Sequence, residues 1–194
     1  TRLIRTASPL KPKLFFITSP NNPDGSLISP EVMDELLSLP TLIVLDEAYI
    51  EFAGEKLGAG LSRIREVPVR ENLIVLRTFS KWAGLAGLRI GYGAFPLWLM
   101  PTLWKSKQPY NVNVAASVAA QVSLAHTDEL ETVVERLKQE RTRLFTALQA
   151  IPYLKPYPTQ SNFILCQVNG RDAAELKTKL AQKHGVFIRY FNKT

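Results

Sequence analysis

Cysteine and histidine are scarce in this sequence: among 194 residues there are one cysteine, Cys166, and two histidines, His126 and His184. A single cysteine cannot form an internal disulfide bond or a cysteine-based metal site. Both histidines fall near expected helix ends, where an imidazole complements the helix dipole, and neither has acidic neighbours at metal-ligand spacing. We therefore expect no metal site, and we interpret Cys166 as a buried strand residue.

Long apolar runs are also missing, since none approaches the roughly 20 residues that a membrane-spanning helix needs. No basic segment followed by an apolar one opens the sequence as a secretory leader does. Hydrophobic residues make up 46% and charged residues 21%, an ordinary balance for a folded protein. The sequence thus predicts a cytoplasmic protein that has no membrane partner.

The net charge of +7 is concentrated at the two ends of the chain. Residues 1–13 carry four basic residues and no acid, and residues 171–194 carry six basic and two acidic residues. A nucleic-acid surface would need this charge along one face with interleaved aromatic residues. We therefore expect no nucleic-acid partner.

Four apolar runs have the length of strands, at residues 13–18, 42–46, 73–76 and 88–94. The first reads as a strand buried on both faces. Ser29, Pro30 and Glu31 begin a helix that should end before Pro40, and a shorter helical piece is expected near 61–65. Strands that alternate with helices or long crossovers predict an α/β fold: a mostly parallel sheet flanked by helices.

The second half reads as mainly helical. We expect an apolar helix within 96–107 that is kinked or broken at Pro101, and helices at 114–125 and 127–150. Three prolines within 151–158 mark a change of composition, so we predict a large domain over 1–150 and part of a smaller α+β domain over 151–194. The smaller piece should contain a strand at 162–168, a helix at 172–184 and a strand at 186–190.

Polar side chains follow the predicted strands where each strand ends. They are Asn22 after the first strand, Asp46 and Tyr49 after the second, Lys81 after the third, and Arg89 before the fourth. Ligands bind at the carboxyl ends of parallel strands, so these groups should converge on one pocket. An amine, an acid, a phenol and a guanidinium are the groups that pyridoxal phosphate requires.

Each residue alone has a simpler explanation. Lys81 can be a solvated lysine in a glycine-rich turn, Asp46 a cap, and Tyr49 a packing residue. Arg89 and Arg189 can form surface ion pairs. The order and strand-end context of the whole set favour the cofactor site.

Three stretches also resemble a known family: SPNNPDG at 19–25, VLDEAY at 44–49, and TFSK followed by GLAGLRIGY within 78–92. In this order and spacing they are similar to the fold-type-I aminotransferases of the aspartate aminotransferase superfamily. The segment GVFIRYF at 185–191 resembles the histidinol-phosphate aminotransferase branch. The resemblance covers essentially the whole chain, and it departs from the family pattern at Asp24, where a threonine is usual.

The resemblance implies roles for individual residues. Lys81 would form the Schiff base with pyridoxal 5'-phosphate and move the proton during catalysis, together with Asp46 at the pyridine nitrogen and Tyr49 at the ring oxygen. The remaining residues implied to bind cofactor or substrate are Asn22 (both), Thr78, Ser80 and Arg89 (cofactor phosphate), Arg189 (substrate phosphate), and Tyr110 and Asn111 (substrate or partner subunit).

The implied activity is transamination between histidinol phosphate or imidazole-acetol phosphate and glutamate or 2-oxoglutarate, in histidine biosynthesis, by a homodimer. Alternatives are an aromatic amino-acid aminotransferase, a phosphothreonine decarboxylase, or a truncated, non-catalytic cofactor-binding domain. The family's phosphate loop, ring-stacking aromatic residue and amino-terminal substrate arm would precede residue 1, and its carboxylate-binding arginine would follow Thr194. We therefore expect a fragment that is inactive or impaired by itself.

Overall fold

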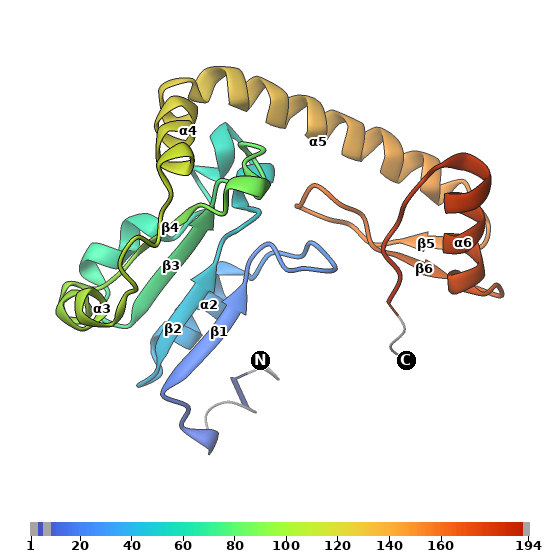
Figure 1. The fold of residues 1–194 in the computed structure, drawn as a ribbon. Helices are drawn as coiled ribbons and strands as arrows, with labels where there is room; N and C mark the ends of the chain where they lie inside the picture. Colours follow the sequence, from blue (N-terminus) through green and yellow to red (C-terminus); the bar gives the residue numbers. More distant parts are fainter. Residues whose placement is uncertain (1–3, 6–8, 192–194) are drawn as a thin grey trace.

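A computed structural model of the protein describes residues 4–5 and 9–191 (Figure 1). Its main sheet has the strand order β1-β2-β3-β4, with β1 (Leu14–Thr18), β2 (Leu42–Asp46), β3 (Leu73–Thr78) and β4 (Gly91–Ala94). The first three strands are parallel, and β4 pairs antiparallel with β3. The predicted α/β fold with a mostly parallel sheet is confirmed.

The reversal before β4 decides which residues share an edge. Thr18 pairs with Asp46 at the carboxyl ends of β1 and β2, and Thr78 at the end of β3 pairs with Gly91. Because β4 runs in the opposite direction, the residues that precede it lie at this same edge. Arg89 is one of them.

One face of the sheet is covered by α2 (Pro30–Leu37). Ser29 caps this helix by accepting a hydrogen bond from Val32, and Pro30 occupies its first turn, as the sequence predicts. Met33 and Leu36 are fully buried, and they belong to a core that includes Ile43, Leu45, Leu73 and Val75 of the strands.

The opposite face of β1 is open, so the prediction of a strand buried on both faces is wrong. The side chains of Leu14 and Phe16 are 51% and 70% exposed. β1 is the edge strand of the described sheet, and its second face is covered by no helix among the described residues. The continuous apolar sequence of β1 therefore does not predict how much of the strand is buried in this structure.

Short 3₁₀ turns connect β2 to β3: η1 (Ile50–Phe52), η2 (Lys56–Gly58) and η3 (Ile64–Val69). The turn η4 (Ala86–Leu88) precedes β4, and η5 (Leu97–Leu99) runs into α3 (Met100–Ser106). Pro101 lies in the first turn of α3, so the expected apolar helix is divided next to this proline, where the 3₁₀ turn η5 gives way to α-helix. Proline fits there because the first turn of a helix has no internal partner for the missing N–H group.

Two helices lead to the carboxyl-terminal part of the chain. α4 (Val114–Ala125) and α5 (Thr127–Gln149) form as predicted. A second hydrophobic core joins α4 and α5 to η1 and to the loop that follows β3. Its buried members are Phe52, Phe79, Trp82, Ala120 and Val134. Figure 1 shows α5 running from the four-stranded sheet to a separate two-stranded sheet.

The two-stranded sheet pairs β5 (Leu154–Pro156) antiparallel with β6 (Cys166–Val168). Only the end of the predicted strand 162–168 forms, and Cys166 is half-buried rather than buried because a two-stranded sheet has little cover. α6 (Ala173–His184) follows, capped by Asp172 and ended by Gly185 at φ 65°, as predicted.

The expected strand at 186–190 is absent from the described chain. Val186 and Phe187 are 47% and 86% exposed, and no strand of the described residues pairs with them. A strand needs a partner for its hydrogen bonds, which an apolar sequence cannot supply by itself. The domain boundary after residue 150 stays a prediction.

Candidate active site

The predicted cofactor residues lie at or next to the strand-end edge of the main sheet. Asn22 lies in the turn after β1, Asp46 ends β2, and Thr78 ends β3. The remaining residues of the set are on the loops that leave this edge: Tyr49 at the start of η1, Ser80 and Lys81 after β3, and Arg89 before β4.

Asn22, Tyr49 and Lys81 are the three residues that the structure joins most directly. The side-chain amide of Asn22 donates a hydrogen bond of 3.0 Å to the phenol oxygen of Tyr49. The Nζ atom of Lys81 lies 5.4 Å from the centre of the Tyr49 ring, within range of a cation–π contact. An amide, a phenol and an exposed amine from three separate segments therefore meet.

The carboxylate of Asp46 keeps one oxygen available. Its Oδ1 atom accepts a hydrogen bond of 2.9 Å from the Ala48 amide, and no hydrogen bond to Oδ2 occurs within the described part of the chain. The side chain is half-buried. This carboxylate can therefore accept a hydrogen bond from a protonated ring nitrogen.

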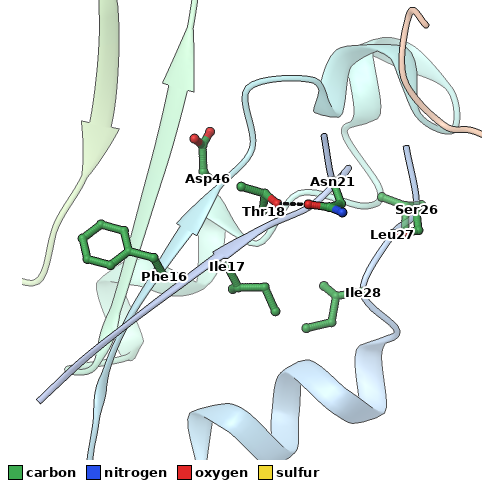
Figure 2. Close-up of a pocket in the computed structure, with 8 residues that line it drawn as sticks. All are labelled: Phe16, Ile17, Thr18, Asn21, Ser26, Leu27, Ile28 and Asp46. Atoms are coloured by element: carbon green, nitrogen blue, oxygen red, sulfur yellow. Dashed lines mark hydrogen bonds between the residues drawn. The ribbon is translucent and has the colours of Figure 1, made fainter. Parts of the chain in front are cut away.

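A hollow of about 420 Å³ lies beside Asp46 at the end of β1 and β2 (Figure 2). It is lined by Phe16, Ile17, Thr18, Asn21, Ser26, Leu27, Ile28 and Asp46. Figure 2 shows Ile17 and Ile28 on the side of α2 and the Asp46 carboxylate directed away from them. Lys81 does not line this hollow. The hollow therefore includes only the Asp46 end of the predicted site.

The groups predicted to hold a phosphate lie around the end of β3. The Thr78 hydroxyl donates to the Ile90 carbonyl (3.3 Å) and accepts from the Ser80 amide (3.0 Å). Arg89 has a left-handed backbone with φ 57°, and its Nη1 atom donates to the Ala86 carbonyl at 3.0 Å. The Arg89 side chain is exposed, so a cation beside the Ser80 hydroxyl is available to an anion.

The predicted substrate residues other than Asn22 are not gathered with this set. The guanidinium carbon of Arg189 lies 5.4 Å from the centre of the Phe191 ring, and the side chain is exposed. Tyr110 is 98% exposed with φ 58°, and Asn111 is exposed as well. Within the described residues, none of the three hydrogen-bonds to Asn22, Tyr49 or Lys81.

Asp24, the departure from the family pattern, has a local role in the turn after β1. Its carboxylate accepts hydrogen bonds from the amide (2.9 Å) and the hydroxyl (2.7 Å) of Ser26. Partial burial opposes ionisation, but these bonds prevail and hold the pKa of Asp24 below its ordinary value. Asp24 therefore stabilises the turn that carries Asn22.

A buried ionic cluster beneath the site was missed by sequence reasoning. Glu47 is 1% exposed and accepts hydrogen bonds from Ser62 (2.6 Å), the Arg63 amide (2.8 Å) and Arg77 Nε (3.2 Å). These contacts occupy Glu47, which supports the choice of Asp46 as the residue that faces a cofactor. The available signal was that Glu47 directly follows Asp46 at the end of β2, because successive side chains of an extended chain point to opposite faces.

Glu51 is the member of this cluster whose buried carboxylate lacks hydrogen-bond partners among the described residues. It is 2% exposed, and Nη1 of Arg77 lies 3.8 Å from its Oε1 atom. Burial raises the pKa of Glu51 to about 7, against the opposing attraction of Arg77.

The described part of the chain contains neither a cluster of metal ligands nor a membrane-spanning helix. No three histidine, cysteine, aspartate or glutamate side chains gather there as metal ligands. The helices of residues 4–5 and 9–191 include none that is long and apolar enough to cross a membrane.

Comparison with known proteins agrees with this fold. The family described as aminotransferase class I and II matches residues 1–194, and the chain belongs to this family. It is 57% identical over 183 residues to histidinol-phosphate aminotransferase 1, chloroplastic, of Arabidopsis thaliana; the match covers 94% of this chain and 42% of that protein. The chain therefore spans less than half the length of this relative.

Solved structures agree with this assignment. Histidinol-phosphate aminotransferase from Sinorhizobium meliloti, in complex with pyridoxal-5'-phosphate, superposes with a TM-score of 0.84 at 30% identity, over 96% of this chain and 51% of that one. L-threonine-O-3-phosphate decarboxylase from Porphyromonas gingivalis superposes with a TM-score of 0.81 at 28% identity, over 91% of this chain and 54% of that one.

Proposed function

We propose that the polypeptide containing this chain is a pyridoxal-phosphate-dependent aminotransferase that exchanges the amino group of histidinol phosphate with 2-oxoglutarate. The observation that carries the proposal is the meeting of Asn22, Tyr49 and Lys81 at the strand-end edge that also carries Asp46. The identity to the Arabidopsis relative supports this substrate over others in the family.

The residues present fit the cofactor. Asp46 has an oxygen without a partner among the described residues, which suits the pyridine nitrogen, and Asn22 and Tyr49 form a polar pair for the ring oxygen. The Ser80 hydroxyl and the exposed Arg89 side chain offer donors to the phosphate, and the Thr78 hydroxyl can join them by releasing its bond to the Ile90 carbonyl.

Bound pyridoxal phosphate supplies a protonated ring that accepts electrons from the substrate α-carbon. Asp46 keeps the proton on the ring nitrogen by pairing with it. Lys81 would hold the cofactor through its amine and would serve as the base for the proton on the substrate α-carbon. Tyr49 and Asn22 orient the ring, and the Thr78 end of β3 anchors it.

The cofactor assignment is tested by absorbance. Full-length protein mixed with pyridoxal phosphate should show a visible band that borohydride reduction fixes covalently and that Lys81→Ala abolishes. Lys107→Ala, which changes an exposed lysine stacked on Trp104, should keep the band. No band from the full-length protein would overturn the cofactor assignment altogether.

Arg189 tests the substrate assignment, because it is proposed to bind the substrate phosphate. Arg189→Ala should reduce kcat/KM for histidinol phosphate far more than for an unphosphorylated aromatic amino acid. Equal losses for both substrates would favour the aromatic aminotransferase alternative. The Porphyromonas structure keeps phosphothreonine decarboxylation as a second candidate, which release of carbon dioxide from that substrate would reveal.

A homodimer with shared active sites is also part of the proposal, supported by the exposure of Tyr110 and Asn111, which a partner subunit could cover. Sedimentation of the full-length protein tests it. The cytoplasmic location stays a prediction; the name of the Arabidopsis relative gives a chloroplast location, and imaging of the tagged full-length protein distinguishes the two.

A further inference from the structure

Residues 159–163, between β5 and β6, contact the turn that carries Asn22. The Gln160 amide donates a hydrogen bond of 2.8 Å to the Gly25 carbonyl. Gly25 has φ 72°, and a Cβ atom built on it would lie 1.8 Å from the Thr159 hydroxyl. Only glycine permits this approach, so the carboxyl-terminal part of the chain is seated against the turn after β1.

The same segment contacts Tyr49. The ring of Phe163 meets the Tyr49 ring edge to face, with centres 5.1 Å apart at 89°. This geometry favours one orientation of the phenol, because the ring edge of one partner is attracted to the face of the other. The phenol so held is the one that accepts the hydrogen bond of Asn22 and lies near Lys81.

Arg141 of α5 links residues 159–163 to the loop that carries Tyr49 by hydrogen bonds. Its Nη1 atom donates to the carbonyls of Phe52 (3.1 Å) and Ser161 (2.9 Å). Phe52 ends the turn η1 that begins after Tyr49, and Ser161 is fully buried. One guanidinium therefore joins the Tyr49 loop, the long helix and the 159–163 segment.

We propose that Phe163 is a positioning residue that sets the orientation of Tyr49 toward the cofactor ring, and that Arg141 holds Phe163 in place. The proposal rests on the proposed function. It adds a wall of the site that comes from beyond the proline-rich stretch 151–158, outside the three family motifs. It makes the electronic state of the bound cofactor depend on a contact made by the carboxyl-terminal part of the chain.

The experiment is a pH titration of the absorbance of the full-length protein loaded with pyridoxal phosphate. A phenol that donates to the ring oxygen stabilises that oxygen's anion, so losing its orientation should raise the apparent pKa of the bound cofactor. Phe163→Leu should show this rise and about two- to tenfold weaker cofactor binding, the fold-change expected for one aromatic pair. Phe163→Tyr keeps the aromatic ring, so its apparent pKa and its cofactor affinity should both equal those of the wild type.

Matched variants separate positioning from general stability. Phe187→Leu changes an exposed phenylalanine of the same part of the chain and should change neither value. Arg141→Met should act in the direction of Phe163→Leu, while Arg143→Met, on an exposed arginine of the same helix, should not. Arg141→Met also decides the matter if Phe163→Leu does not fold.

The outcomes are distinguishable. A normal band with unchanged titration and affinity in both Phe163→Leu and Arg141→Met overturns this inference and leaves the proposed function intact. Weaker binding without a change in the titration also overturns it, because that is the effect of a merely structural role. A wild-type protein without a band overturns both proposals.

Discussion

Glu51 provides a prediction that depends only on the buried cluster and not on the cofactor. Its pKa in the folded protein is raised by burial to about 7, from an ordinary value of 4.5. Between these two values the folded protein holds a proton that the unfolded chain releases, so the free energy of unfolding falls as pH rises through this window. The difference corresponds to about 3 kcal/mol once the pH is above 7.

Glu51→Gln keeps the size of the side chain and removes its ionisation, so it should remove this cost. The expected gain in the free energy of unfolding is under about 1 kcal/mol at pH 5 and about 3 kcal/mol at pH 8. Arg77 remains paired with Glu47 in the variant, since those two side chains make their own hydrogen bond of 3.2 Å. Urea unfolding of the wild type and the variant, followed by tryptophan fluorescence across this pH range, measures the gain.

Glu55→Gln is the matched control, because Glu55 is an exposed glutamate of the same stretch. It should leave the pH dependence as in the wild type. If Glu51→Gln instead lowers stability equally at pH 5 and pH 8, Glu51 is ionised and paired with Arg77 throughout, and the reasoning from burial is refuted.

Two further predictions concern contacts beneath and beside the site. Arg77→Met leaves Glu47 buried without its cation and should reduce the free energy of unfolding by about 3–5 kcal/mol, whereas Arg70→Met, on a more exposed arginine, should change it by less than about 1 kcal/mol in the same urea titration. Gly25→Ala meets both a left-handed backbone and a close neighbour and should reduce stability by about 1–3 kcal/mol, while Gly60→Ala, with open space around it, should be neutral or slightly stabilising. An unaffected thermal midpoint in Gly25→Ala would show that the 159–163 segment is not seated there.

Local patterns in the sequence were sufficient for most of the secondary structure. Ser29 and Pro30 begin α2, and Asp172 and Gly185 bound α6, because capping and left-handed turns depend on a few adjacent residues. The strand ends could be predicted in the same way, and with them the edge at which Asp46 and Lys81 should lie. The roles of individual site residues came from the family resemblance and stay predictions until they are tested.

Tertiary structure decided the burial of the strands, their pairing and the contacts between distant residues, none of which local sequence patterns can predict. The exposed face of β1 and the missing strand at 186–190 both depend on which partner lies alongside, and no stretch of sequence contains its own partner. The pairing of Arg77 with buried acids, and the contact of Phe163 with Tyr49, join residues far apart in the chain. By itself the sequence determined where the first two strands of the main sheet end and which chemical groups stand there; only folding decided which of those groups meet, because their distances depend on the packing of the whole chain.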